Sequence, residues 1–70
     1  MMSETEIKIL AAADATDRLR EAFPEMGLLE FRHKAVELLK IMGFDGNIAM
    51  QGVRDACADM QAPPQGVTQQ

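Results

Sequence analysis

The side chains best suited to acid–base or nucleophilic chemistry are few and lie far apart. His33 is the only histidine and Cys57 the only cysteine. His33 stands between Arg32 and Lys34 and four residues before Glu37, a run typical of a solvated helix face. A catalytic histidine needs a nucleophile or an acid within hydrogen-bond reach, and the sequence indicates neither. We therefore predict no catalytic residues and no enzymatic activity.

A metal or cofactor site is not expected either. One cysteine and one histidine fall short of the four ligands that a structural zinc site needs. Asp45-Gly46-Asn47 begins like a calcium-binding loop, but the residues after it do not continue the ligand pattern. No glycine-rich phosphate loop is present, so no cofactor is predicted. Cys57 falls on an apolar helix face, which indicates a buried and inert thiol.

Two arginines fall among apolar residues, where they could pair with a carboxylate of another protein. At helical spacing Arg32 projects between Val36 and Leu39, and Arg20 projects inside the apolar stripe of an earlier helix. Each could lay its methylenes along the edge of the core and keep its guanidinium in water. Each could instead be an interface residue, because arginine is enriched at binding hot spots and forms bidentate pairs with carboxylates. The sequence leaves both interpretations open.

Three amphipathic helices are predicted to position these residues. The first should span about residues 4–23, since Ser3 and Glu6 form a capping box at its start and Pro24 stops it. The second should begin near Met26 or Gly27 and end at Gly43. One stripe of each helix repeats a 3-4 spacing: Ile9, Ala12, Thr16, Leu19 and Phe23 in the first, and Leu28, Phe31, Ala35, Leu38 and Met42 in the second.

The third helix should follow a turn at residues 44–47 and run to about Gln61, with Asp45 or Asn47 as its cap. Gly52 should weaken it by up to about 1 kcal/mol relative to alanine. Residues 62–70 contain two prolines and no periodicity, which predicts a disordered tail. The fold class is thus all-α, a helical hairpin plus a shorter third helix, with one helical domain at residues 1–61.

A homodimer is expected from the size of the chain and from the second helix. Seventy residues with no disulfide rarely bury enough apolar surface alone. Leu29, Val36 and Leu39 widen the apolar arc of the second helix to about 180°, more than one neighbouring helix covers. These three residues are left to the third helix, a second subunit or the target, and we assign part of this arc to the second subunit. The predicted protein-interface residues are Leu29, Phe31, Arg32, Val36, Leu39 and Arg20.

Charge and hydropathy narrow the classes of partner. Seven Lys and Arg against eleven Asp and Glu give a net charge of −4, which repels a phosphate backbone. The second and third helices, with their short glycine turn, also allow a helix-turn-helix DNA-binding regulator, although the third helix carries more acids than bases. No apolar run is long enough to span a membrane, and the start of the chain is acidic, so a cytoplasmic protein is expected.

Met42-Gly43-Phe44, followed by Ala49, resembles the Met-Gly-Phe loop of ubiquitin-associated domains. Those domains have another helix after the one that follows the loop, whereas this chain continues into Pro63-Pro64. We therefore assign no such membership.

The expected function is stoichiometric binding of another protein. The chain would act as a small inhibitor, anti-activator or adaptor of a larger bacterial protein, possibly encoded by a phage. The alternatives are the helix-turn-helix regulator and a structural or assembly subunit of a larger particle.

Overall fold

Three helices make up most of the chain. The computed structural model describes residues 2–61, apart from the side chains of Asp59 and Gln61. Its helices are α1 (Glu4–Ala22), α2 (Leu28–Ile41) and α3 (Gly46–Gln61), and residues 2–61 contain no strand. The all-α prediction is therefore confirmed. The predicted disordered tail, residues 62–70, lies outside the described residues.

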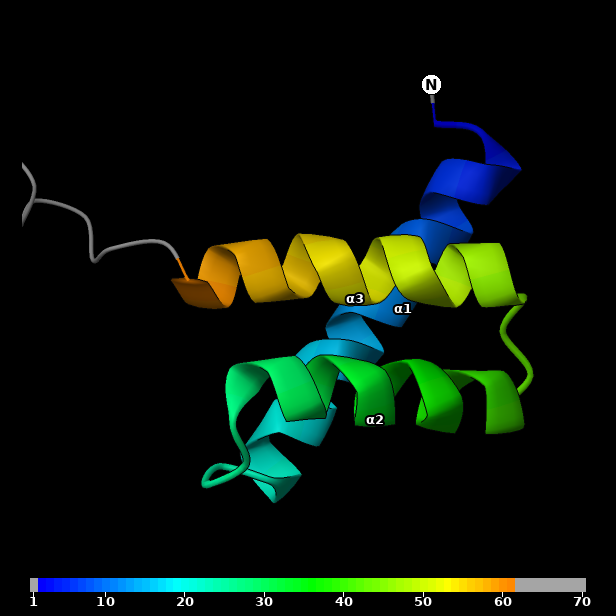
Figure 1. Cartoon of the computed structure of the whole chain (residues 1–70). Helices are drawn as coiled ribbons and strands as arrows, with labels where there is room; N and C mark the ends of the chain where they lie inside the picture. The colour runs from blue at the N-terminus through cyan, green and yellow to red at the C-terminus, as the bar shows by residue number, and fades with distance from the viewer. Residues whose placement is uncertain (1, 62–70) are drawn as a thin grey trace, which may run out of the picture.

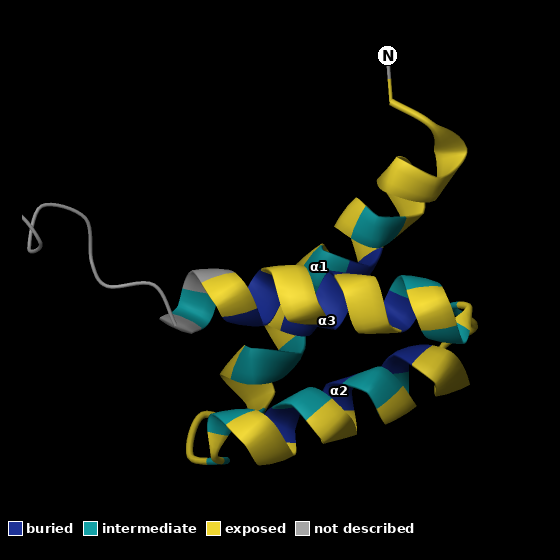
Figure 2. Ribbon diagram, turned by 45° about the horizontal axis from the view of Figure 1, so that its top comes forward, coloured by how far each residue is buried: buried dark blue, intermediate teal, exposed yellow. Residues whose placement is uncertain are grey.

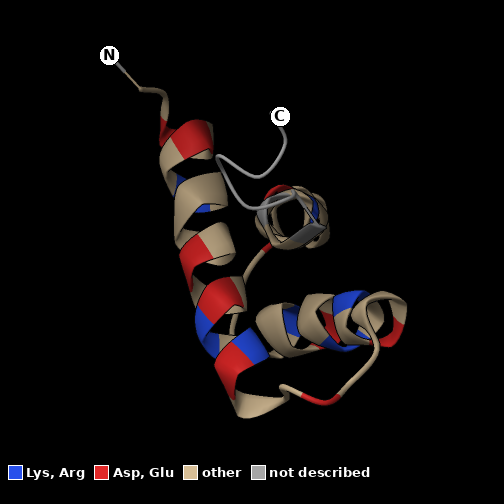
Figure 3. Ribbon diagram, turned by 90° about the vertical axis from the view of Figure 1, so that its left-hand side faces the viewer, with Lys and Arg blue, Asp and Glu red and all other residues tan. Residues whose placement is uncertain are grey.

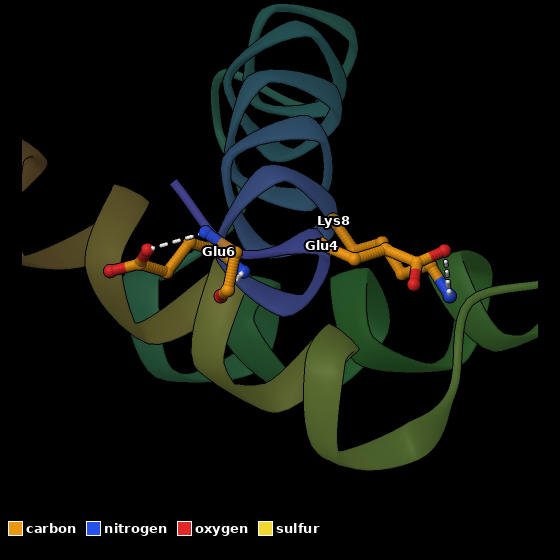
Figure 4. Close-up of polar contacts among 4 residues, drawn as sticks. Glu4, Glu6 and Lys8 are labelled. Carbon is orange, nitrogen blue, oxygen red and sulfur yellow. Dashed lines mark hydrogen bonds and ion pairs between the residues drawn. The ribbon is translucent and has the colours of Figure 1, made fainter. Parts of the chain in front are cut away.

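The start of α1 is held by the predicted capping box. The Glu6 amide donates to Ser3 Oγ at 3.1 Å, and the Ser3 amide donates to Glu6 Oε1 at 2.9 Å (Figure 4). Lys8 pairs with Glu4 at 3.9 Å on the same turn, but both side chains are exposed, so this pair adds little stability. Local hydrogen bonds of the capping box thus account for where α1 begins.

The end of α2 and the start of α3 also follow from local residues. Gly43 has a φ of 111°, which only glycine adopts readily, and it ends α2 as predicted. The Phe44 amide then donates to the Leu39 carbonyl at 3.0 Å. At the start of α3 the Asn47 amide donates to Asp45 Oδ2 at 2.9 Å, so Asp45 is the capping residue.

The helices form two layers. α2 and α3 run side by side in opposite directions, and α1 crosses behind both of them (Figure 1). Figure 3 shows α1 on one side of this pair, in a molecule whose Cα atoms span 41 × 34 × 15 Å. The hairpin is therefore made by α2 and α3. The expectation of a shorter third helix was wrong, because α3 has 16 residues and α2 has 14.

The core lies between the two layers (Figure 2). Its buried side chains are Ala12 and Thr16 of α1, Phe31, Ala35 and Leu39 of α2, and Ala49, Val53, Ala56 and Cys57 of α3. The Thr16 hydroxyl donates to the Ala12 carbonyl at 2.8 Å, so this buried polar group is satisfied. Gly52 lies directly against Ala12, where α3 crosses α1.

The wide apolar arc of α2 is largely covered within the chain. Leu39 is completely buried, as is Phe31, because α1 and α3 together cover more of α2 than a single neighbour would. Cover by the third helix was one of the three alternatives for Leu39, and the assignment of Leu39 to a contact with a second subunit was wrong. No helix within residues 2–61 is long and apolar enough to cross a membrane.

Candidate protein-binding groove

An open groove of about 550 Å³ lies between α2 and α3. Four residues of α2 line it, namely Leu29, Arg32, His33 and Val36. Five residues of α3 line the other side, namely Asn47, Met50, Gln51, Val53 and Arg54. No residue of α1 is among them, because α1 packs on the other side of the pair (Figure 3). The groove is thus formed by two antiparallel helices and is open to solvent.

The lining residues form one stripe on each helix. On α2 they stand at positions i, i+3, i+4 and i+7 from Leu29, and on α3 they follow the same spacing from Asn47 to Arg54, with Val53 beside them. Residues at this spacing lie on one face of a helix. Each stripe is about 10 Å long at 1.5 Å per residue. The groove therefore has two matching walls, each about two helical turns long.

Both walls of the groove carry exposed apolar residues. Leu29 on the α2 wall and Met50 on the α3 wall have 67% and 59% of their surface exposed. Val36 is half-buried beside them, and Val53 belongs to the core. Exposed leucine and methionine side chains on a concave surface gain free energy when a partner removes them from water.

The polar residues of the groove are cationic or neutral. Arg32 stands on the α2 wall and Arg54 on the α3 wall, with His33 beside the first. No aspartate or glutamate lines the groove, although the chain as a whole has a net charge of −4. The acids next to lining residues in the sequence, Glu30, Glu37 and Asp55, are exposed outside it. The groove is therefore a local positive surface on an acidic protein.

Three of the six predicted interface residues meet in this groove: Leu29, Arg32 and Val36. Phe31 and Leu39 do not, since both are fully buried in the core and offer no surface to a partner. Sequence reasoning missed the contribution of α3 altogether. By helical spacing alone, Met50 falls on the apolar face of α3, whereas Gln51 and Arg54 fall on its polar face. The groove lies along the boundary between these two faces.

Arg20 makes structural contacts within the chain, and it does not line the groove. Its Nη1 donates to the Met26 carbonyl at 2.7 Å and to the Phe23 carbonyl at 3.3 Å. Its guanidinium carbon also lies 5.1 Å from the centroid of the Phe31 ring, within the range of a cation–π interaction. These contacts tie the end of α1 to the loop before α2. Neither alternative considered from the sequence included them.

Cys57 is buried on α3, as predicted. Burial raises the pKa of its thiol, because the thiolate would lose its hydration. The charges of Arg32 and Arg20 oppose this effect, and Asp17 adds to it. The thiol is thus kept neutral and shielded, which is the condition of a structural cysteine.

A second hollow, of about 600 Å³, lies at the end of the molecule where α1 begins and α2 passes into α3. Its lining residues are Thr5, Lys8, Met42, Gly43, Phe44, Asp45 and Ile48. Ile41 and Met42, at the end of α2, have 80% and 59% of their surface exposed. Unlike the groove, this hollow contains one cationic and one anionic side chain.

Among the described side chains, no group of three His, Cys, Asp or Glu residues is placed to hold a metal ion. Comparison of the sequence with protein-family models gives no match, and comparisons with curated proteins and with solved structures give none. The groove itself is therefore the basis for assigning a function.

Proposed function

We propose that this chain binds another protein through the groove between α2 and α3 and regulates it stoichiometrically, as an inhibitor, anti-activator or adaptor of a larger bacterial or phage protein. One observation carries the proposal. Leu29 and Met50 are exposed on facing walls of a groove whose charged residues are Arg32 and Arg54. Methionine and arginine are enriched at protein–protein interfaces, and arginine is enriched at binding hot spots. Catalysis has no part in this proposal.

The proposal is tested by affinity capture with matched variants of the whole chain. Leu29→Glu introduces a charge into the groove, and Leu10→Glu introduces the same charge at a leucine of α1 outside it. Both leucines are more than half exposed, at 67% and 54%, so both variants should fold. We expect the native chain and Leu10→Glu to capture one protein in a 1:1 complex by native mass spectrometry, and Leu29→Glu to lose it. Capture that survives Leu29→Glu would contradict a groove-based function.

DNA binding is the second candidate, and the cationic groove is the observation that favours it. Arg32 and Arg54 would offer positive charge to a phosphate backbone. The exposed Leu29 and Met50 on the same walls fit an apolar contact better, and the net charge of −4 repels DNA over longer distances. We therefore expect labelled duplex DNA at low salt to bind no tighter than about 10⁻⁴ M. Micromolar binding that Arg54→Glu abolishes would reverse the order of the two candidates.

The proposed homodimer would use the second hollow, where α1 begins and α2 passes into α3. Two copies joined through the groove would bring arginines against arginines. Lys8 and Asp45 in the other hollow have opposite charges, so a two-fold axis could pair Lys8 of one copy with Asp45 of the next. Ile41 and Met42 would supply apolar contact. Sedimentation equilibrium should show a dimer that Met42→Asp dissociates, and a native chain that stays monomeric at micromolar concentration would rule the dimer out.

A further inference from the structure

We infer that the groove receives a single amphipathic α-helix of the partner, with an apolar ridge flanked on both sides by carboxylates. This inference rests on the proposed function and specifies the chemistry of the bound segment. The helical walls of the groove favour a helix as the bound segment, and the two arginines favour carboxylates on it.

The backbone of the groove walls favours a helix over an extended peptide. Both walls are helices, whose backbone amides and carbonyls bond within the helix, so the groove has no strand edge to offer. An extended peptide laid on Leu29, Val36 and Met50 would lose water from its own backbone groups without gaining partners. A helix satisfies these groups internally and presents residues at i, i+3, i+4 and i+7, the spacing found on both walls.

The positions of the two arginines indicate carboxylates on both flanks of that helix. Arg32 belongs to the α2 wall and Arg54 to the α3 wall, so a helix in the groove would have one guanidinium on each side. Leu29 and Met50 lie on the same walls and would contact the apolar ridge. Guanidinium groups pair bidentately with carboxylates, whereas lysines on the helix would be repelled. The groove thus selects acidic over basic amphipathic helices.

A synthetic peptide pair tests this selection directly. Both peptides are helices stabilised by a side-chain staple, with leucines along one face. One carries glutamates on both flanks, and the other carries lysines at the same positions. Binding of each labelled peptide to the whole chain is measured by fluorescence anisotropy at low salt. We expect the glutamate peptide to bind at least about tenfold more tightly than the lysine peptide.

Charge reversal of the protein provides the second arm. The Arg32→Glu, Arg54→Glu double variant should reverse the preference and bind the lysine peptide more tightly. Because Arg32 is half-buried, Arg54→Glu alone serves as the variant whose fold is secure, since Arg54 is exposed on α3. Arg54→Glu should weaken the binding of the glutamate peptide by about tenfold or more. Circular dichroism of each variant checks that the helices are retained.

The outcomes separate this inference from the proposed function. Equal binding of both peptides, with loss of both in Leu29→Glu, would overturn the carboxylate chemistry but support the groove as a protein-binding site. Preference for the lysine peptide, or no binding of either peptide, would overturn the inference. Binding to duplex DNA or to phosphatidylserine vesicles, lost in Arg54→Glu and without peptide binding, would overturn it in favour of an anionic phosphate partner.

Discussion

Gly52 of α3 and Ala12 of α1 meet so closely that no atom fits between them. A Cβ placed on Gly52 would overlap the Ala12 Cβ, and it would lie 2.9 Å from both the Ala12 carbonyl carbon and the Ala13 amide nitrogen. Real Cβ atoms are essentially never found within 3.0 Å of such atoms, so a larger residue would have to move one helix. Gly52 therefore sets the distance between the two layers of the fold.

Gly52→Ala should destabilise the protein, although alanine is the better helix former. Helix propensity alone would stabilise α3 by about 1 kcal/mol. Overpacking against the Ala12 backbone should outweigh this gain, for a net loss of roughly 1–3 kcal/mol. Urea unfolding followed by circular dichroism measures the change in the free energy of unfolding.

Gly46→Ala is the matched control within the same helix. A Cβ at Gly46 would meet no atom within 4 Å, and its φ is outside the positive range. This substitution should leave the free energy of unfolding unchanged or raise it by a few tenths of a kcal/mol. A Gly52→Ala variant as stable as Gly46→Ala would show that the helices separate at no cost.

The helix boundaries were predictable because their causes are local. Each boundary is set by residues within a few positions of it: the Ser3 and Glu6 capping box, Pro24 and Gly43. The helices begin or end near these residues as predicted. The apolar stripes predicted most of the core for the same reason. Ala12, Thr16 and Ala35 repeat at helical spacing whatever the helices pack against.

The groove could not be predicted, because it depends on how the helices pack. Leu29 and Leu39 both belong to the apolar arc of α2, and only the packing of α1 and α3 against α2 decides that one is exposed and the other buried. Gly52 was interpreted as a weakness of α3 because its contact with Ala12 joins residues far apart in the sequence. Arg20 likewise finds its carbonyl partners in a loop whose path no local pattern defines.

Leu39→Ala and Leu29→Ala should differ sharply in their effects on stability. Leu39 is completely buried, so its truncation leaves a cavity and should cost about 2–5 kcal/mol. Leu29 is 67% exposed, so its truncation should cost at most about 0.5 kcal/mol. Urea unfolding compares the two variants. Equal effects would mean that the packing of α2 against α3 is not as described.

Cys57 should make the protein less stable at alkaline pH. Because burial raises its pKa, the folded chain keeps the thiol proton at a pH where the unfolded chain has lost it. The contribution of the thiol to the free energy of unfolding is complete below its ordinary pKa of 9.0. It is lost as the pH rises toward the higher pKa of the thiol in the folded chain. The free energy of unfolding should therefore fall more steeply above pH 9.0 in the native chain than in Cys57→Ala. Parallel curves for the two proteins would show that the thiol is not protected by burial.

Arg20 and Arg32 should separate stability from binding. Arg20→Met keeps an apolar stem but loses the hydrogen bonds to the Met26 and Phe23 carbonyls, so it should lower the free energy of unfolding by roughly 1–2 kcal/mol, given that Arg20 is partly exposed. It should leave binding of the glutamate peptide unchanged. Arg32→Met should have the opposite profile, with stability within about 0.5 kcal/mol of the native chain and peptide binding at least about tenfold weaker. Urea unfolding and fluorescence anisotropy on both variants give the comparison. If Arg20→Met weakened peptide binding while the fold kept its stability, Arg20 would be an interface residue and not a structural one.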